Sequence, residues 1–134
     1  MIRANSKELV GACAIVEKTR SKLLISDKTF RFVFREDNFI DPRYFNHVLK
    51  SPVLRTQIEQ QASGTSPTMK NISKEKVMNL QSPFTPLAAQ YHIVAYLDGL
   101  QAKVDELRHL QAATQKELDA LMPSILANAF AGEL

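Results

Sequence analysis

Histidines and neighbouring carboxylates are the side chains in this sequence that could bind a metal or act as acid and base. His47, His92 and His109 lie on separate segments, and none has a second histidine or a cysteine at the spacing of a metal site. Asp105 and Glu106 are adjacent on an expected helix, so their side chains point apart and do not form an acid/base pair. We therefore expect these groups to be ordinary surface residues.

Phosphate chemistry also lacks its usual signatures here. The chain has only four glycines and no glycine-rich phosphate loop, dinucleotide fingerprint or nucleophile elbow. We predict that the protein is not an enzyme and uses no metal and no cofactor.

Cysteine usage indicates the compartment. Cys13 is the single cysteine, which excludes an internal disulfide and fits a reducing environment. Its alanine neighbours favour a buried small residue, with a reactive thiol as the alternative. No apolar run of membrane-spanning length and no signal-peptide core is present, so the sequence predicts a cytoplasmic protein without membrane contact.

Charge is distributed unevenly along the chain. Residues 1–85 hold 14 Lys/Arg against 8 Asp/Glu, whereas residues 86–134 hold 3 against 6. The basic part could approach a polyanion, and the acidic part would not. Such a balance is also common in proteins that never touch nucleic acid, so both interpretations stay open.

The elements that would position these residues follow from the apolar pattern. Residues 10–16 and 23–34 read as strands, the second either as one strand or as two paired strands with a bend near residues 26–27. In it Phe30, Phe32 and Phe34 alternate toward one buried face. We predict three short helices, which start at Asp41-Pro42, at Ser51-Pro52 and after Ser73. The third is expected to run to Leu80. Residues 62–71 read as a loop anchored by Ile72. The predicted fold class is α+β, a small mixed globular head followed by one long helix.

The strongest pattern is a seven-residue apolar repeat in the last third of the chain. One line runs through Leu97, Val104, Gln111, Leu118 and Ile125, and a second runs through Leu100, Leu107, Thr114 and Leu121. This is the seam of a helix that packs against another helix. The helix is expected from Pro86 to Leu121, about 50 Å at ~1.5 Å per residue. Pro123 is expected to kink or reset it before a last turn ending at Gly132.

No other segment of the chain could form a helix of comparable length. The seam is therefore predicted to pair with another molecule, and the alternative is that it packs on the chain's own head. Gln111 and Thr114 interrupt the seam, either as a polar step that sets register or as a solvent-accessible midpoint.

Several motifs carry a resemblance to a known family. From Asp41 onward they are DPRYFNHVLKSP, QIEQQASGTSPTMKNIS, SPFTPLAAQYHIVAYLD, the heptad helix and ELDALMPSILANAFAGEL; upstream, GACAIV and LLISDKTFRFVF look like strands. Together they resemble the DNA specificity subunit of type I restriction–modification systems. The most specific pieces are PL-A-x-Q-x-x-I-V-x-x-LD and the A-F-x-G-x-L terminus.

The resemblance implies an architecture and partners. In that family two target-recognition domains are each followed by a long helix, and the two helices pair as an antiparallel coiled coil. The subunit is non-catalytic and recruits methyltransferase (modification) subunits and, through them, restriction subunits. Here residues 1–85 would be a partial target-recognition domain and residues 86–134 one pairing helix. With a single helix per chain, the resemblance implies a homodimer or pairing with a partner subunit.

The resemblance also suggests which residues contact double-stranded DNA; for the loop from Gly64 to Lys70 the alternative is a plain surface loop. It places the loop from Gly64 to Lys70 near the duplex, with Gly64 allowing close approach, Lys70 supplying charge, and hydroxyls from Thr65, Ser66 and Thr68. Further candidates for phosphate contacts are Arg20, Lys22, Lys28 and Arg31.

Two interpretations follow from these observations. In the first, the chain is a half-length DNA-specificity module. In the second, it is a truncated specificity fragment that binds restriction or methyltransferase subunits and regulates them without reading DNA, because residues 1–85 are fewer than a full recognition domain of the family contains.

Overall fold

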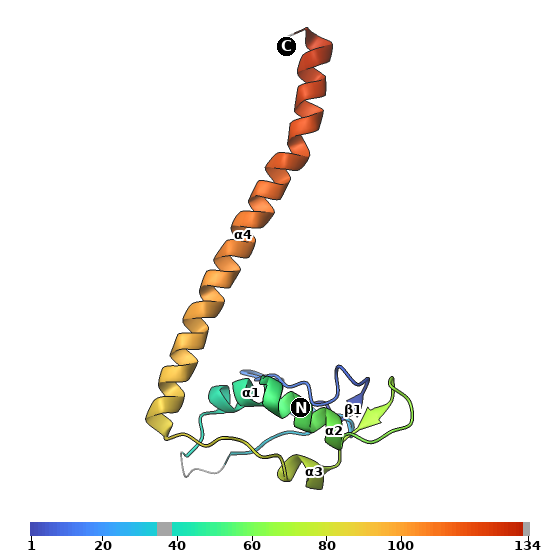
Figure 1. Ribbon diagram of the computed structural model, residues 1–134, viewed down its shortest axis with the longest axis vertical. Coiled ribbons are helices and arrows are strands. Elements are labelled where there is room, and N and C mark those ends of the chain that lie inside the picture. The colour runs from blue at the N-terminus through green and yellow to red at the C-terminus, as the bar shows by residue number, and fades with distance from the viewer. Residues whose placement is uncertain (35–38, 133–134) are drawn as a thin grey trace. The chain divides into compact units, whose positions relative to one another are not determined.

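The computed structural model describes residues 1–34 and 39–132 and divides the chain into two units, residues 1–94 and 95–134. Its elements in order are β1 (Ala4–Asn5), α1 (Pro42–Lys50), α2 (Pro52–Gln61), β2 (Lys70–Asn71), α3 (Lys74–Met78) and α4 (Leu87–Ala131) (Figure 1). β1 pairs antiparallel with β2, and α1 packs against α2. The predicted α+β class with a long terminal helix is confirmed.

The three short helices begin where their caps were predicted. The carboxylate of Asp41 accepts hydrogen bonds from the backbone N–H groups of Arg43 and Tyr44, at 2.7 and 2.8 Å, with Pro42 in the first turn. Ser51 and Ser73 cap α2 and α3 in the same way. These side chains satisfy N–H groups that a helix start leaves without an intrahelical partner.

The two predicted strands are wrong. Residues 7–11 form turns, residues 12–20 have no regular secondary structure, and Thr29 makes one isolated bridge to Ile2. A strand needs a neighbour along its length, and here the neighbour is only the short segment 1–5. Phe30 N donates to Met1 O at 2.8 Å and Gly11 N donates to Ile2 O at 2.7 Å, but these bonds cover only a few residues of each predicted strand.

The predicted alternation of phenylalanines holds for Phe30 and Phe32, whereas Phe34 is 40% exposed. Phe30 and Phe32 are partly buried against the core, whereas Val33 is 77% exposed. Phe32 and Phe34 both meet the ring of Phe45 edge-on, with centroid distances of 5.0 and 5.5 Å. An extended segment can therefore bury one face without forming a ladder.

The core of residues 1–94 is small. Val10, Ile58 and Ile72 are completely buried, so Ile72 is the anchor that the sequence predicted. Gly11 has a φ of +82°, and a Cβ there would lie 2.6 Å from Ile58 Cγ2. Glycine is required at this position for both reasons, because a side chain would clash and would disfavour the left-handed backbone.

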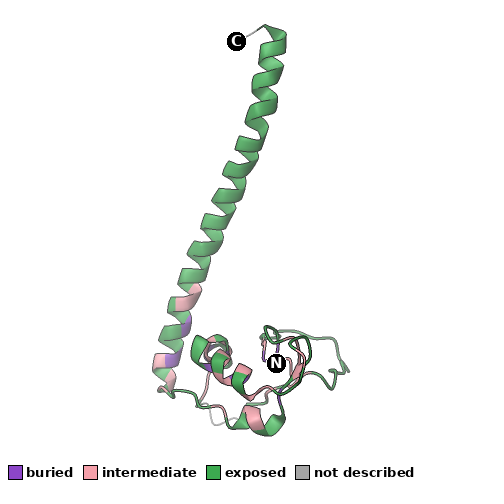
Figure 2. Cartoon of the chain, turned by 45° about the vertical axis from the view of Figure 1, so that its right-hand side comes forward, coloured by how far each residue is buried: buried purple, intermediate pink, exposed green. Residues whose placement is uncertain are grey.

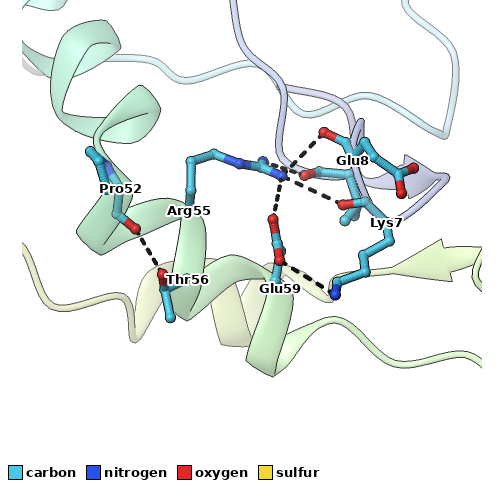
Figure 3. Close-up of polar contacts among 7 residues, drawn as sticks. Lys7, Glu8, Pro52, Arg55, Thr56 and Glu59 are labelled. Carbon is cyan, nitrogen blue, oxygen red and sulfur yellow. Dashed lines mark hydrogen bonds and ion pairs between the residues drawn. The ribbon is translucent and has the colours of Figure 1, made fainter.

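Arg55 fastens the turn before this glycine onto α2 (Figure 3). Its guanidinium donates to the carbonyl oxygens of Val10 at 2.6 Å and Glu8 at 3.2 Å, and it pairs with Glu59 at 3.4 Å. One planar group with several N–H donors thereby satisfies carbonyl oxygens to which no neighbouring strand donates.

α4 is a single helix of 45 residues, about 68 Å at ~1.5 Å per residue. It continues through Pro123, so the predicted reset at this residue is wrong. Proline removes one intrahelical N–H, and the turns on both sides retain theirs. Gly132, with a φ of +73°, follows the helix as predicted. Among the described residues, no helix has the length and apolar character needed to cross a bilayer.

Candidate partner-helix and nucleic-acid surfaces

The apolar seam of α4 is uncovered over most of its length. Its six apolar members between residues 100 and 125 are 40–59% exposed, and Leu97 is half-buried; the six are Leu100, Val104, Leu107, Leu118, Leu121 and Ile125. Figure 2 shows the exposed colour continuing along this helix. A helix stripe of this kind gains stability by packing on a partner.

The two polar residues in the seam differ from one another. The hydroxyl of Thr114 donates to the carbonyl of Leu110 in its own helix, at 3.1 Å, so its hydrogen is already used. The amide of Gln111 makes no hydrogen bond within the described residues. Of the two polar residues in the seam, Gln111 is therefore the one whose side chain is still available to hydrogen-bond to a partner helix.

Pairs within the helix use most of the polar groups on one flank of the seam. Gln101 donates to Asp105 at 2.9 Å, Arg108 lies 3.7 Å from the same carboxylate, and Gln115 donates to Asp119 at 2.7 Å. Such pairs stabilise the helix modestly. They leave the apolar line itself free for a partner.

Gln90 fixes the first turns of α4, which belong to residues 1–94. It is completely buried; its amide nitrogen donates to Phe39 O at 2.9 Å and Thr85 O at 2.8 Å, and its oxygen accepts from Asp41 N at 2.8 Å. Gln90 was not among the residues predicted to matter, although a lone glutamine inside the apolar PLAAQYHIV motif was a signal that it has a structural role.

The predicted phosphate contacts of the N-terminal region are all exposed. Arg20, Lys22, Lys28 and Arg31 make no ion pair within the described residues, so their charges are available. Arg20 and Lys22 lie in the irregular segment after residue 12, and Lys22 has a positive φ of 61°.

Three cations from distant parts of the sequence meet around one small cavity. The cavity, of about 350 Å³, is lined by Arg3, Lys28 and Lys70, together with Asp27. The guanidinium of Arg3 lies 5.5 Å from the ring centroid of Phe30, and its Nε donates to Asn71 at 3.4 Å. Arg3 was missed, because only the β1–β2 pairing brings it beside Lys70.

The loop from Gly64 to Lys70 uses many of its polar groups to close on itself. Lys70 Nζ donates to Gly64 O at 2.6 Å, and the hydroxyls of Ser66 and Thr68 are 2.8 Å apart. A Cβ on Gly64 would overlap the carbonyl of Met69, so this glycine already has a structural reason. Thr65 is exposed.

An apolar cavity of about 480 Å³ lies over the irregular segment and α1. Its lining includes Cys13, Ile15, Ile25, Phe34 and Asn46. Burial raises the pKa of the Cys13 thiol, which donates to Asn46 O at 3.9 Å. Cys13 is thus partly buried among apolar groups, as predicted. Across the described residues, no group of histidine, cysteine and carboxylate side chains could hold a metal ion.

The structure thus combines a small mixed head with a helix whose apolar seam is uncovered within the described residues. Comparison with known proteins identifies relatives of this chain. The chain is 35% identical over 128 residues to the type I restriction enzyme EcoEI specificity subunit of Escherichia coli, covering 92% of this chain and 21% of that protein.

Two further specificity subunits match over nearly the whole chain. The StySPI subunit of Salmonella potsdam is 29% identical over 131 residues, and the EcoKI subunit of Escherichia coli is 30% identical over 130 residues. The matches cover 98% and 96% of this chain and 27% of each relative. No family model and no solved structure matches the chain.

The resemblance that the motifs indicated is therefore confirmed. The chain is related to a segment of type I restriction enzyme specificity subunits, and it spans about a fifth to a quarter of the length of the curated relatives it matches.

Proposed function

We propose that the protein is a non-catalytic DNA-specificity module of a type I restriction–modification system, acting in the cytoplasm. Residues 1–85 serve as a partial target-recognition domain and residues 86–134 as the pairing helix. The similarity to three specificity subunits supports the class, and methyltransferase and restriction subunits are the partners that this class implies.

The observation that carries the proposal is the seam of α4. The seam repeats over about thirty residues and is uncovered within the described part of the chain. A second copy of the chain offers an identical seam, so the module is an antiparallel homodimer by resemblance to the paired helices of the family.

The oligomeric state tests the proposal directly. Replacing Leu100, Leu107 and Leu121 together with Glu buries six charges in the dimer and is expected to give a monomer by light scattering. The matched control places Glu at Ala102, Ala113 and Ala120, on the opposite side of the helix, and should remain a dimer. An unchanged dimer mass in the leucine variant would refute helix pairing.

Binding to duplex DNA is the second part of the proposal. The cations Arg3, Lys28 and Lys70 surround one cavity and would contact phosphates rather than bases; Lys28 is exposed, and the other two are partly buried. Affinity is then weak and strongly salt-dependent, with a dissociation constant of about 10⁻⁴ to 10⁻⁶ M at physiological salt.

A fluorescence titration with several unrelated duplexes at two salt concentrations measures this binding. Replacing the three cations with Ala should weaken binding to every duplex alike and reduce the salt slope by up to about three. The control removes the same charge at Lys50, Lys74 and Lys116. No binding at low salt would favour the alternative, a fragment that regulates restriction or methyltransferase subunits without contacting DNA. A strong preference for one duplex would instead show that the protein recognises a base sequence by itself.

A further inference from the structure

We propose that the α4 helices of two copies pair antiparallel in one register, centred between Leu107 and Gln111 and selected by Lys103 of each copy facing Glu117 of the other. The inference rests on the proposed homodimer and specifies its geometry. In this register the facing seam residues are Leu97 with Leu121, Leu100 with Leu118, Val104 with Thr114, and Leu107 with Gln111.

Charges beside the seam distinguish the possible arrangements. Lys103 precedes the seam residue Val104 by one position, and Glu117 precedes Leu118 in the same way, so both occupy the same flank. In antiparallel pairs this flank meets the same flank of the other helix. With the register above, each Lys103 lies beside a Glu117, and the twofold axis creates the contact twice. Both side chains are exposed and make no ion pair within the described residues.

A parallel pair would be disfavoured by the same charges. In a parallel coiled coil, a residue on the flank of Lys103 faces a residue on the other flank of the partner helix, five positions farther along the sequence. Lys103 would then face Arg108 of the second copy, again twice. Like charges in this position oppose assembly, so Lys103 selects against the parallel arrangement.

Leu110 gives an independent reason for the register. It lies outside the seam, on the flank of Lys103 and Glu117, and it is 55% exposed. In the proposed register Leu110 meets its own copy across the twofold axis, and its apolar surface is covered. An antiparallel register shifted by one heptad would place Leu110 of one copy beside Glu117 or Lys103 of the other, according to the direction of the shift. Such a shift would also separate Lys103 from Glu117 of the other copy.

The opposite flank of the seam opposes this register only weakly. It brings Arg108 of each copy beside the other across the twofold axis, where like charges repel. Each guanidinium already lies 3.7 Å from the carboxylate of Asp105 in its own helix, and that pair is exposed to solvent. Two favourable contacts at Lys103 and Glu117 therefore outweigh one partly neutralised contact.

Thr114 and Gln111 fit this arrangement differently. The hydroxyl of Thr114 is bonded to Leu110 O, so the residue can face Val104 with its methyl group. Gln111 faces Leu107, and its unbonded amide can reach the edge of the pair. The polar step of the seam is thus reduced to one residue per copy.

Charge reversal at the two positions tests the register. The full-length chain carries Lys103→Glu, Glu117→Lys or both, and the dimer dissociation constant is measured by sedimentation at low salt. Each single change should raise that constant by about tenfold, since two like-charged contacts replace two ion pairs. The double change should return it to within about threefold of the unmodified chain, and high salt should reduce all of these differences.

Lys116→Glu is the matched control, because it reverses a lysine on the outer face and should leave the dissociation constant unchanged. Circular dichroism of each variant establishes that α4 remains helical. A tighter dimer with Lys103→Glu would overturn the proposal in favour of parallel helices, where the introduced carboxylate would face Arg108. No effect of either single change would overturn it in favour of a shifted register. A monomeric unmodified chain would instead refute the homodimer itself.

Discussion

Residues 1–94 and residues 95–134 treat their apolar side chains in opposite ways. The first unit encloses Val10, Ile58 and Ile72 completely, whereas in the second every residue from 99 to 132 is exposed (Figure 2). An isolated helix gains little from intrinsic propensity, and most helix stability in proteins comes from burying an apolar face. The first unit therefore has internal contacts to stabilise it, and the second is expected to depend on a partner.

The largest expected difference between the two units is in how their stability depends on protein concentration. If α4 is ordered by pairing, each tenfold dilution at concentrations well above the dimer dissociation constant lowers its stability by about 1.4 kcal/mol, while the core of residues 1–94 is unaffected. Hydrogen exchange at several protein concentrations measures this difference for amides of α4 against amides of α2. Equal, concentration-independent protection of both helices would contradict the expectation that α4 depends on a partner.

A large-to-small substitution in each unit should have different consequences. Ile58→Ala removes a completely buried side chain and should lower the free energy of unfolding of the first unit by about 3 kcal/mol. Leu118→Ala should leave that free energy unchanged and weaken the dimer instead. Urea denaturation at fixed concentration, with mass measurements in parallel, tests both expectations. A loss of head stability in the Leu118 variant would show that the seam packs on the head.

Substitution of Gln90 tests whether the start of α4 belongs to the folded unit of residues 1–94. Gln90→Ala leaves the backbone groups of Phe39, Asp41 and Thr85 without their partner, which should cost about 2 kcal/mol of the first unit's stability. Gln101→Ala, on an exposed part of the same helix, should change it by less than about 0.5 kcal/mol. Urea denaturation of both variants measures the difference, and similar effects at the two sites would contradict an anchored helix start.

Cys13 should show the smallest effect, confined to reactivity. Burial raises the pKa of its thiol, so less thiolate is present at neutral pH than in a free cysteine. Alkylation of the folded chain should be slow at pH 7 and accelerate as the pH rises toward the raised pKa. Urea should remove this protection. For comparison, a cysteine placed at Ala113, on the exposed outer face of α4, in a Cys13→Ala background should react at the rate of a free thiol in folded protein.

Local patterns were sufficient for part of this molecule. The caps at Asp41, Ser51 and Ser73 were predicted because each depends only on residues within one turn. The heptad of α4 was visible for the same reason, since a helix repeats its own geometry. The relationship to type I specificity subunits also followed from contiguous motifs, and sequence similarity confirmed it.

The candidate phosphate site shows what such patterns could not reach. Lys28 and Lys70 were recognised as candidate DNA contacts, but their meeting with Arg3 depends on pairing between residues 4–5 and 70–71. Gln90 was overlooked because its three partners lie on two other segments.

Spacing along one segment was enough to predict where the helices begin, their caps, which residues form the seam, and the inward positions of Phe30 and Phe32. The tertiary structure was needed to show that residues 10–16 and 23–34 do not form strands. It also decided that Arg55 fastens the turn at residues 7–10, and that Arg3 joins the lysines. Strand formation and side-chain clusters depend on which distant segment supplies a neighbour, and hydrogen bonds and burial are satisfied only once that neighbour is in place.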